Sequence, residues 1–139
     1  MLKRINLLTF MILLILVGTM LMSGCTPETP KPDLVPVNPE GLENFCDRDG
    51  MGRLKVHVKN QGNAPAGSFH VQVSYGQDDP PVELVPSLEA GETVTVLFQL
   101  YSGCFDPVCE FEITVDVYDE VDESNELNNT QKRGMFIKP

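Results

Sequence analysis

Alternating apolar runs that end at clusters of turn-forming residues constrain the fold of this chain most strongly. Residues 54–58, 69–75, 94–100 and 111–117 each place an apolar side chain at nearly every second position. A period of two is typical of a half-buried β-strand. The segments that follow two of these runs, 59–67 and 119–129, are rich in Asn, Gly and Asp, which favour turn geometry. The sequence therefore predicts short β-strands joined by tight turns.

Three weaker runs, at 34–37, 82–85 and 131–137, bring the expected number of strands to seven. Beyond the N-terminal leader, no stretch shows the apolar spacing of a helix. Seven short strands with turn signals between them predict an all-β fold, a seven-stranded immunoglobulin or fibronectin III-like antiparallel β-sandwich. A closed barrel is the lesser alternative.

Length and charge limit the number of domains and the class of partner. A chain of 139 residues has room for one modest core. It carries 20 acidic and 10 basic side chains, and setting aside Lys3 and Arg4 of the leader leaves 8 basic against the same 20 acidic. This excess of negative charge argues against nucleic acid as a partner, because each phosphate contact would add repulsion.

The N-terminus resembles a bacterial lipoprotein signal. Lys3 and Arg4 precede an apolar stretch at 7–22, and Met22-Ser-Gly-Cys25 closes it with small residues before a cysteine. The resemblance implies cleavage after residue 24 and a lipid on Cys25. An uncleaved signal anchor is the alternative, since the apolar run is only somewhat shorter than a membrane span. Either reading places the domain outside the cytoplasm, at the cell surface or facing the periplasm, and ties it to a membrane.

Residues 25–31 form a proline-rich tether ahead of the domain, which we expect to occupy 32–137. Proline favours an extended chain of about 3.1 Å per residue, so this tether reaches only about 20 Å from the lipid. The domain is thus predicted to work close to its own membrane.

Four segments resemble the CARDB domain, the cell adhesion related domain found in bacteria. They are Pro32-Asp-Leu-Val35 and the turn-ended stretches at 58–67, 88–96 and 115–129. The resemblance implies an immunoglobulin-like sandwich of the kind found in bacterial and archaeal surface proteins. It also implies a binding or adhesion-type module that recognises a protein or an envelope polymer. A structural accessory lipoprotein, without a ligand of its own, is the alternative.

Three cysteines remain once Cys25 is set aside, namely Cys46, Cys104 and Cys109. An odd number in an exported domain predicts one disulfide and one further thiol, or an intermolecular bridge. In the sandwich order the turns that carry them lie at one end, so a bridge from Cys46 to Cys104 or Cys109 is favoured. A short Cys104–Cys109 bridge and three free thiols are the alternatives. Four well-spaced zinc ligands are lacking.

The acid-rich turn suggests a weak calcium site. Its candidate ligands are Asp119, Glu120, Asp122, Glu123 and Glu126, because hard cations take several oxygens from one loop. The order of an EF-hand is missing, and we expect a structural turn whose acids face water. The shorter segment Asp47-Arg-Asp-Gly50 is a weaker candidate still. No metal and no cofactor are expected.

An enzymatic role is not expected. Catalysis would need a nucleophile, a base and an orienting acid that meet in a cleft. The two histidines, His57 and His70, are predicted to lie in opposite sheets with their side chains facing outward, so they cannot meet.

Overall fold

Seven β-strands make up the domain in a computed structural model that describes residues 29–40, 42, 45–104 and 108–137. A short 3-10 helix, η2, lies between the fifth and sixth strands. In chain order the strands are β1 (Leu34–Val37), β2 (Leu54–Asn60), β3 (Phe69–Ser74), β4 (Val82–Val85), β5 (Thr93–Phe98), β6 (Val108–Val115) and β7 (Thr130–Ile137), and η2 is Ser102–Cys104.

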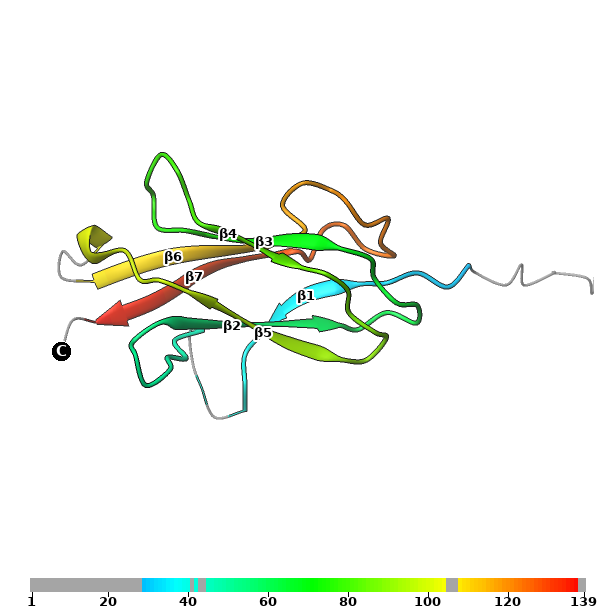
Figure 1. The fold of residues 1–139 in the computed structure, drawn as a ribbon, viewed down its shortest axis with the longest axis horizontal. Helices are drawn as coiled ribbons and strands as arrows, with labels where there is room; N and C mark the ends of the chain where they lie inside the picture. Colours follow the sequence, from blue (N-terminus) through cyan, green and yellow to red (C-terminus); the bar gives the residue numbers. More distant parts are fainter. Residues whose placement is uncertain (1–28, 41, 43–44, 105–107, 138–139) are drawn as a thin grey trace, which may run out of the picture.

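The strands form two antiparallel sheets stacked face to face (Figure 1). The three-stranded sheet has the order β1-β2-β5, and the four-stranded sheet has the order β4-β3-β6-β7. Every pairing is antiparallel. This is the predicted immunoglobulin-like sandwich, and its two separate sheets replace the alternative of a closed barrel.

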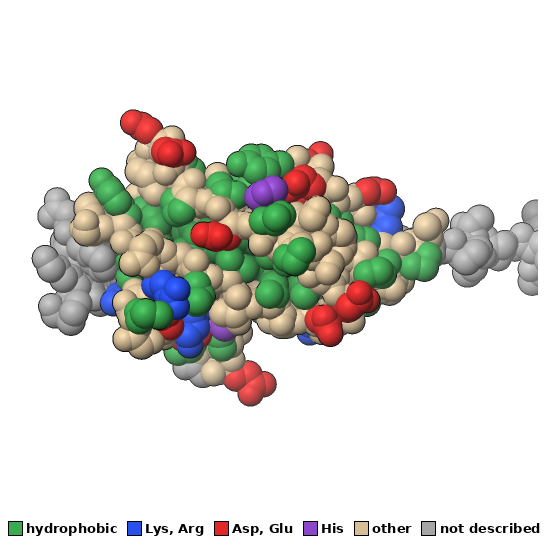
Figure 2. Space-filling model, viewed as in Figure 1, with side chains coloured by type: hydrophobic (Ala, Val, Ile, Leu, Met, Phe, Trp, Pro, Cys, Tyr) green, Lys and Arg blue, Asp and Glu red, His purple; other side chains and the backbone are tan. Residues whose placement is uncertain are grey.

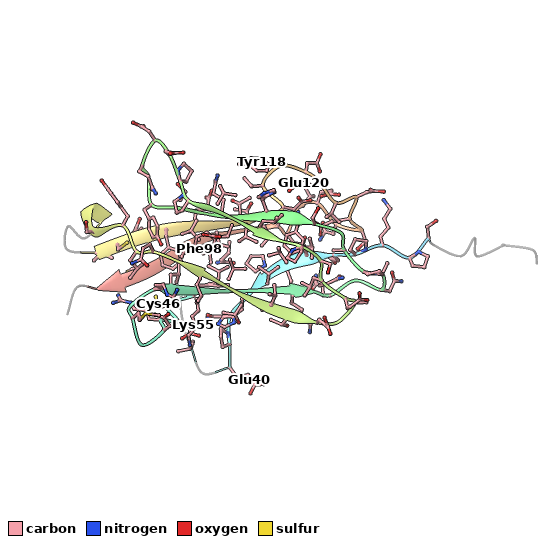
Figure 3. All side chains as sticks on the ribbon, viewed as in Figure 1. Glu40, Cys46, Lys55, Phe98, Tyr118 and Glu120 are labelled. Carbon is pink, nitrogen blue, oxygen red and sulfur yellow. The ribbon has the colours of Figure 1, made fainter. Side chains whose placement is uncertain are left out.

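The core lies between the sheets, where alternate side chains from both inner faces meet. Phe98 of β5 points into this space (Figure 3) and is buried together with Phe69 of β3. In β2 the inward Leu54, Val56 and Val58 are buried, as the period of two predicted. Burial of such side chains stabilises each sheet by about 1.5–3 kcal/mol per residue.

Two of the weak strands begin and end where the sequence predicted, at Leu34–Val37 and Val82–Val85. The sixth strand differs, because it begins at Val108 and ends at Val115, two residues before the predicted end. Asp116 has a positive φ of 49°, and its carboxylate accepts hydrogen bonds of 2.9 Å from the N–H groups of Glu120 and Val121. This buried side chain ends the strand and starts the acid-rich turn.

Candidate binding surface

Three of the four edge strands carry features that oppose pairing with another chain. β1 contains Pro36. β4 contains Glu83 and is flanked by Pro81 and Pro86, and the sequence of β7 includes Lys132 and Arg133. Proline removes a backbone donor and charge disfavours sheet extension, and both are common protections of exposed edges.

The fourth edge strand, β5, has no such protection. Its sequence is Thr-Val-Thr-Val-Leu-Phe, with neither proline nor charge. β-branched and aromatic residues of this kind favour an extended strand. β5 pairs with β2 on one side only, so its other side is open. An open, uncharged edge is a template for another strand.

The open backbone groups of β5 follow from its register with β2. The N–H of Asn60 donates to the carbonyl oxygen of Glu92 at 3.0 Å, which marks a hydrogen-bonded position. Bonded and non-bonded positions alternate along an antiparallel ladder. The N–H and C=O groups of Thr93, Thr95 and Leu97, which face Lys59, His57 and Lys55 in register, therefore point away from β2.

A groove of about 440 Å³ lies between the edge strands β5 and β4. Leu84 of β4 and Leu97 of β5 are 57% and 36% exposed and line it together. Figure 2 shows hydrophobic side chains along the middle of the face that carries these two strands. The groove is lined by Arg53, Glu83, Leu84, Val85, Pro86, Val94, Thr95, Val96 and Leu97.

A hydrogen-bonded chain orders the outer face beside β5. His57 Nε2 lies 2.9 Å from Asp47 Oδ2, and Thr95 Oγ1 lies 3.0 Å from His57 Nδ1. The hydrogen bond from His57, helped by Lys55, holds the pKa of Asp47 below its ordinary value, although partial burial of the carboxylate opposes this. Asp47 is therefore ionised at neutral pH and fixes the imidazole against β5.

Basic side chains gather on β2 and on the turn that leads into it. Arg53 bonds Asp49 at 2.6 Å and Lys55 lies 3.3 Å from Asp47. Lys59 is exposed and has no ion pair among the described residues. Figure 2 shows Lys and Arg side chains grouped at one end of the β4–β5 face. Because Asp49 and Asp47 neutralise Arg53 and Lys55, Lys59 contributes the unpaired positive charge of this basic row in a chain of net charge −10.

An aromatic patch covers the outer face of the four-stranded sheet. Tyr118, which is 59% exposed, makes an edge contact with His70 at 5.1 Å between ring centroids. His70 Nδ1 lies 2.6 Å from Glu120 Oε2, and His70 is the register partner of Leu84. Tyr118 and Glu120 both lie on this side of the molecule (Figure 3). Through Leu84 the patch is continuous with the groove.

The histidines lie as predicted, His57 on β2 of one sheet and His70 on β3 of the other. Both side chains are half-buried and hydrogen-bonded to carboxylates rather than freely exposed. They do not come together into one site.

The prediction that the acids of the last turn face water is wrong for Glu123. This side chain is 4% exposed. Its carboxylate accepts hydrogen bonds from the backbone N–H of Leu34 and from Asn129 Nδ2, the latter at 2.9 Å. Burial raises the pKa of Glu123 to about 7 despite these bonds. The turn folds back onto β1, so the carboxylate gains the N–H of Leu34 in addition to Asn129 of its own turn.

The other calcium candidates are spread over different contacts. Asp122 bonds Lys31 at 2.5 Å, and Glu126 accepts the N–H of Glu123 at 2.7 Å. Asp119 is exposed and has a positive φ of 57°. Over the described residues, no group of three or more His, Cys, Asp or Glu side chains is placed to hold a metal ion.

Lys31 lies within the domain, one residue ahead of the predicted boundary. Its backbone N–H donates to Asn63 Oδ1 at 2.9 Å, and its carbonyl oxygen accepts from the N–H of Asn63 at 3.1 Å. The predicted signal peptide and Cys25 lie outside the described residues. Within the part of the chain that is described, no helix is long and apolar enough to cross a membrane.

Cys46 and Cys109 lie at the same end of the sandwich. Cys109 is fully buried in the core, and Cys46 packs against that core. The thiol of Cys46 donates to the carbonyl oxygen of Met135, which pairs in register with Glu110. The side chain of Cys104 is not among those described, so the disulfide pairing stays a prediction.

A family comparison decides what kind of domain this is. The CARDB family model matches residues 31–133, the span of the sandwich from Lys31 into β7. The chain belongs to the CARDB family.

A solved structure has the same fold as this CARDB domain. It is the solution NMR structure of residues 272–376 of a cell surface protein from Methanosarcina acetivorans. The TM-score is 0.62 at 26% sequence identity, over 78% of this chain and 93% of that one. No curated protein matches the chain significantly.

Proposed function

We propose that this protein is a lipid-anchored, extracytoplasmic binding module that captures a protein partner along the open β5 edge. The observation that carries the proposal is the contrast among the four edges, because only β5 lacks both proline and charge. The adjoining groove offers apolar surface for side chains of the partner.

The family and the structural neighbour support a place outside the cytoplasm. CARDB is by name a cell adhesion related domain, and the neighbour in Methanosarcina acetivorans is a cell surface protein. The lipoprotein-like leader supports the same location. An envelope polymer is the second class of partner, but its polar surface fits the apolar part of the groove less well.

The short distance that the domain reaches from the membrane limits the kind of partner it can bind. A domain of this size has a radius of gyration of about 13 Å, and the tether adds about 20 Å, so the whole extends about 50 Å from the membrane. Contact with another cell is difficult at that height. The partner is therefore expected in the same envelope.

The structural accessory role is the competing proposal. The exposed apolar and aromatic side chains argue against it. An accessory protein would be expected to present an evenly acidic surface. Instead the exposed Leu84 and Leu97 line one groove, and the exposed Tyr118 contacts His70, the register partner of Leu84. Exposed aromatic and apolar groups of this kind are typical of protein interfaces.

The order Thr95, His57, Asp47 resembles that of a catalytic triad, but we do not propose an enzyme. Thr95 lies in mid-strand on a flat outer face. Backbone N–H groups of a sheet lie in its plane, so they cannot converge on a carbonyl oxygen above that hydroxyl. The chain instead orders the surface beside β5.

Affinity capture of the full-length lipoprotein from its native membrane tests the proposed function. We expect a reproducible partner with the unchanged protein, and its loss with Leu97→Glu, which places a negative charge on the open edge. Thr114→Glu, on the outer face of β6, is the matched control and should keep the partner. Recovery of no reproducible partner, or equal recovery with both variants, would support the accessory role.

A further inference from the structure

The geometry points to strand addition as the mode of capture. We propose that a free extended segment of the partner pairs with β5, and that its residues alternate between apolar and acidic. This inference rests on the proposed function and adds the chemistry of the partner. Strand addition of this kind has three requirements. They are open backbone groups on β5, a space for the side chains on one face of the segment, and charges that attract the side chains on its other face.

The open backbone of β5 supplies the first requirement. Thr93, Thr95 and Leu97 present their N–H and C=O groups outward at every second position. An added strand pairs at the same spacing, and such main-chain bonds give affinity without dependence on sequence. β4 cannot do the same equally well, because Pro81 and Pro86 bracket its four residues.

The groove supplies the second requirement. A strand added to β5 would extend the three-stranded sheet, and its inward side chains would enter the space beside Leu84, Val85 and Pro86. Leu84, Val85 and Pro86 form the apolar part of a groove that Arg53 and Glu83 also line, so inward residues placed beside these three should be apolar. The outer rim residue Leu97 would be covered by the same strand.

A second copy of this chain cannot fill the groove through its own β5. The inward Val96 and Phe98 of that strand are already buried in the core of its domain, and Val94 packs against that core. Only a segment with both faces available can place side chains between the sheets. The occupant is therefore a free extended segment of another protein.

The basic row supplies the third requirement. Added strands lie about 4.8 Å apart, so the outward side chains of the segment would lie about 10 Å from β2. The long side chains of Lys55 and Lys59 project from that face, opposite Leu97 and Thr93 in register. Acidic outward residues would meet them, whereas basic ones would be repelled.

The net charge of the whole protein disfavours binding of an acidic segment elsewhere on its surface. The net charge of −10 repels an acidic segment from most of the surface. Arg53 and Lys55 are ion-paired with Asp49 and Asp47, whereas Lys59, opposite Thr93, has no ion pair among the described residues. The repulsion is therefore weakest beside the start of β5. Charge would thus direct the segment to this edge, and apolar residues would hold it there.

Titration of the full mature protein with short synthetic peptides tests the inference. One peptide alternates valine and glutamate, and the matched control alternates valine and lysine. We expect the valine–glutamate peptide to bind about tenfold more tightly or better. Hydrogen exchange followed by NMR should show new protection at the amides of Thr93, Thr95 and Leu97, with none at Gln72 or Thr114. N-methylation of the backbone amides along the peptide edge that pairs with β5 should abolish binding.

Two variants with the same change in charge separate local from general electrostatics. Lys59→Gln should weaken binding of the valine–glutamate peptide severalfold, whereas Thr114→Glu should leave it nearly unchanged. Equal effects would contradict the role of the basic row.

Three outcomes would overturn the inference: no binding of either peptide, binding without protection on β5, or a concentration-dependent dimer that blocks the peptide. If partner capture still depends on Leu97 in any of these cases, the proposed function stands and only strand addition fails.

Discussion

Asn129 Nδ2 lies 2.9 Å from Glu123 Oε1, and both side chains are buried. The second carboxylate oxygen of Glu123 accepts the backbone N–H of Leu34, 89 residues away in the chain. The backbone N–H of Ser124 also donates to the carbonyl oxygen of Pro32 at 2.8 Å. The acid-rich turn is therefore a clamp that holds β1, the strand that follows the predicted tether.

Removal of this clamp should destabilise the domain. Glu123→Ala leaves the buried N–H of Leu34 and the amide of Asn129 without their acceptor, which costs about 1–3 kcal/mol. Glu123→Gln keeps a carbonyl oxygen at the same place and should cost less. Urea unfolding of the two variants measures the difference. An alanine variant as stable as the unchanged protein would show that the clamp contributes nothing.

Stability should also depend on pH through Glu123. Burial raises its folded pKa from 4.5 to about 7, so the folded state holds the proton more tightly than the unfolded chain. The free energy of unfolding should then fall as pH rises from about 4.5 to about 7, by about 1–3 kcal/mol, and level off above that. Glu123→Gln should remove this part of the slope. Parallel pH profiles for the two proteins would contradict the assignment.

Gly62 is predicted to tolerate no side chain. A Cβ there would lie 2.5 Å from the carbonyl oxygen of Lys31 and 2.6 Å from the N of Asp33, both backbone atoms. Gly62→Ala should lower the free energy of unfolding by about 1–3 kcal/mol. Gly67→Ala is the control, because a Cβ at that position meets nothing within 4 Å. Similar melting temperatures for the two variants would mean that the backbone of residues 31–33 is not held against the turn at Gly62.

Mass spectrometry of the mature N-terminus checks the anchor. We expect a chain that begins at Cys25 and carries a diacylglycerol group on its thiol. Cys25→Ser should leave the leader uncleaved and the lipid absent, without a change in the folded domain. Detection of an unmodified Met1 on the natural protein would contradict the lipid anchor and support the uncleaved signal anchor.

The strands could be predicted from the sequence, but the buried polar contacts could not. A short apolar run bounded by turn residues depends only on neighbouring residues, which is why even Leu34–Val37 and Val82–Val85 were predicted correctly. The burial of Glu123 depends on β1, which is remote in sequence, so a local pattern of acids predicted exposure. The end of β6 at Val115 was missed because Asp116 bonds to residues after it.

The open edge could be predicted only in part. The lack of proline and charge at 93–98 is visible in the sequence. Which strands lie at an edge follows from the order of the sheets, and that order depends on contacts between distant segments. The same contacts place Leu84 beside Leu97 and so create the groove.

Site-specific photo-crosslinking in the native envelope tests the central claim most directly. A photoreactive residue at position 95 would lie on the open edge, and one at position 114 would lie on the outer face of the other sheet. We predict that position 95 of the intact protein crosslinks to one reproducible protein and that position 114 does not. Crosslinks of equal yield from both positions, or none from position 95, would contradict binding along β5.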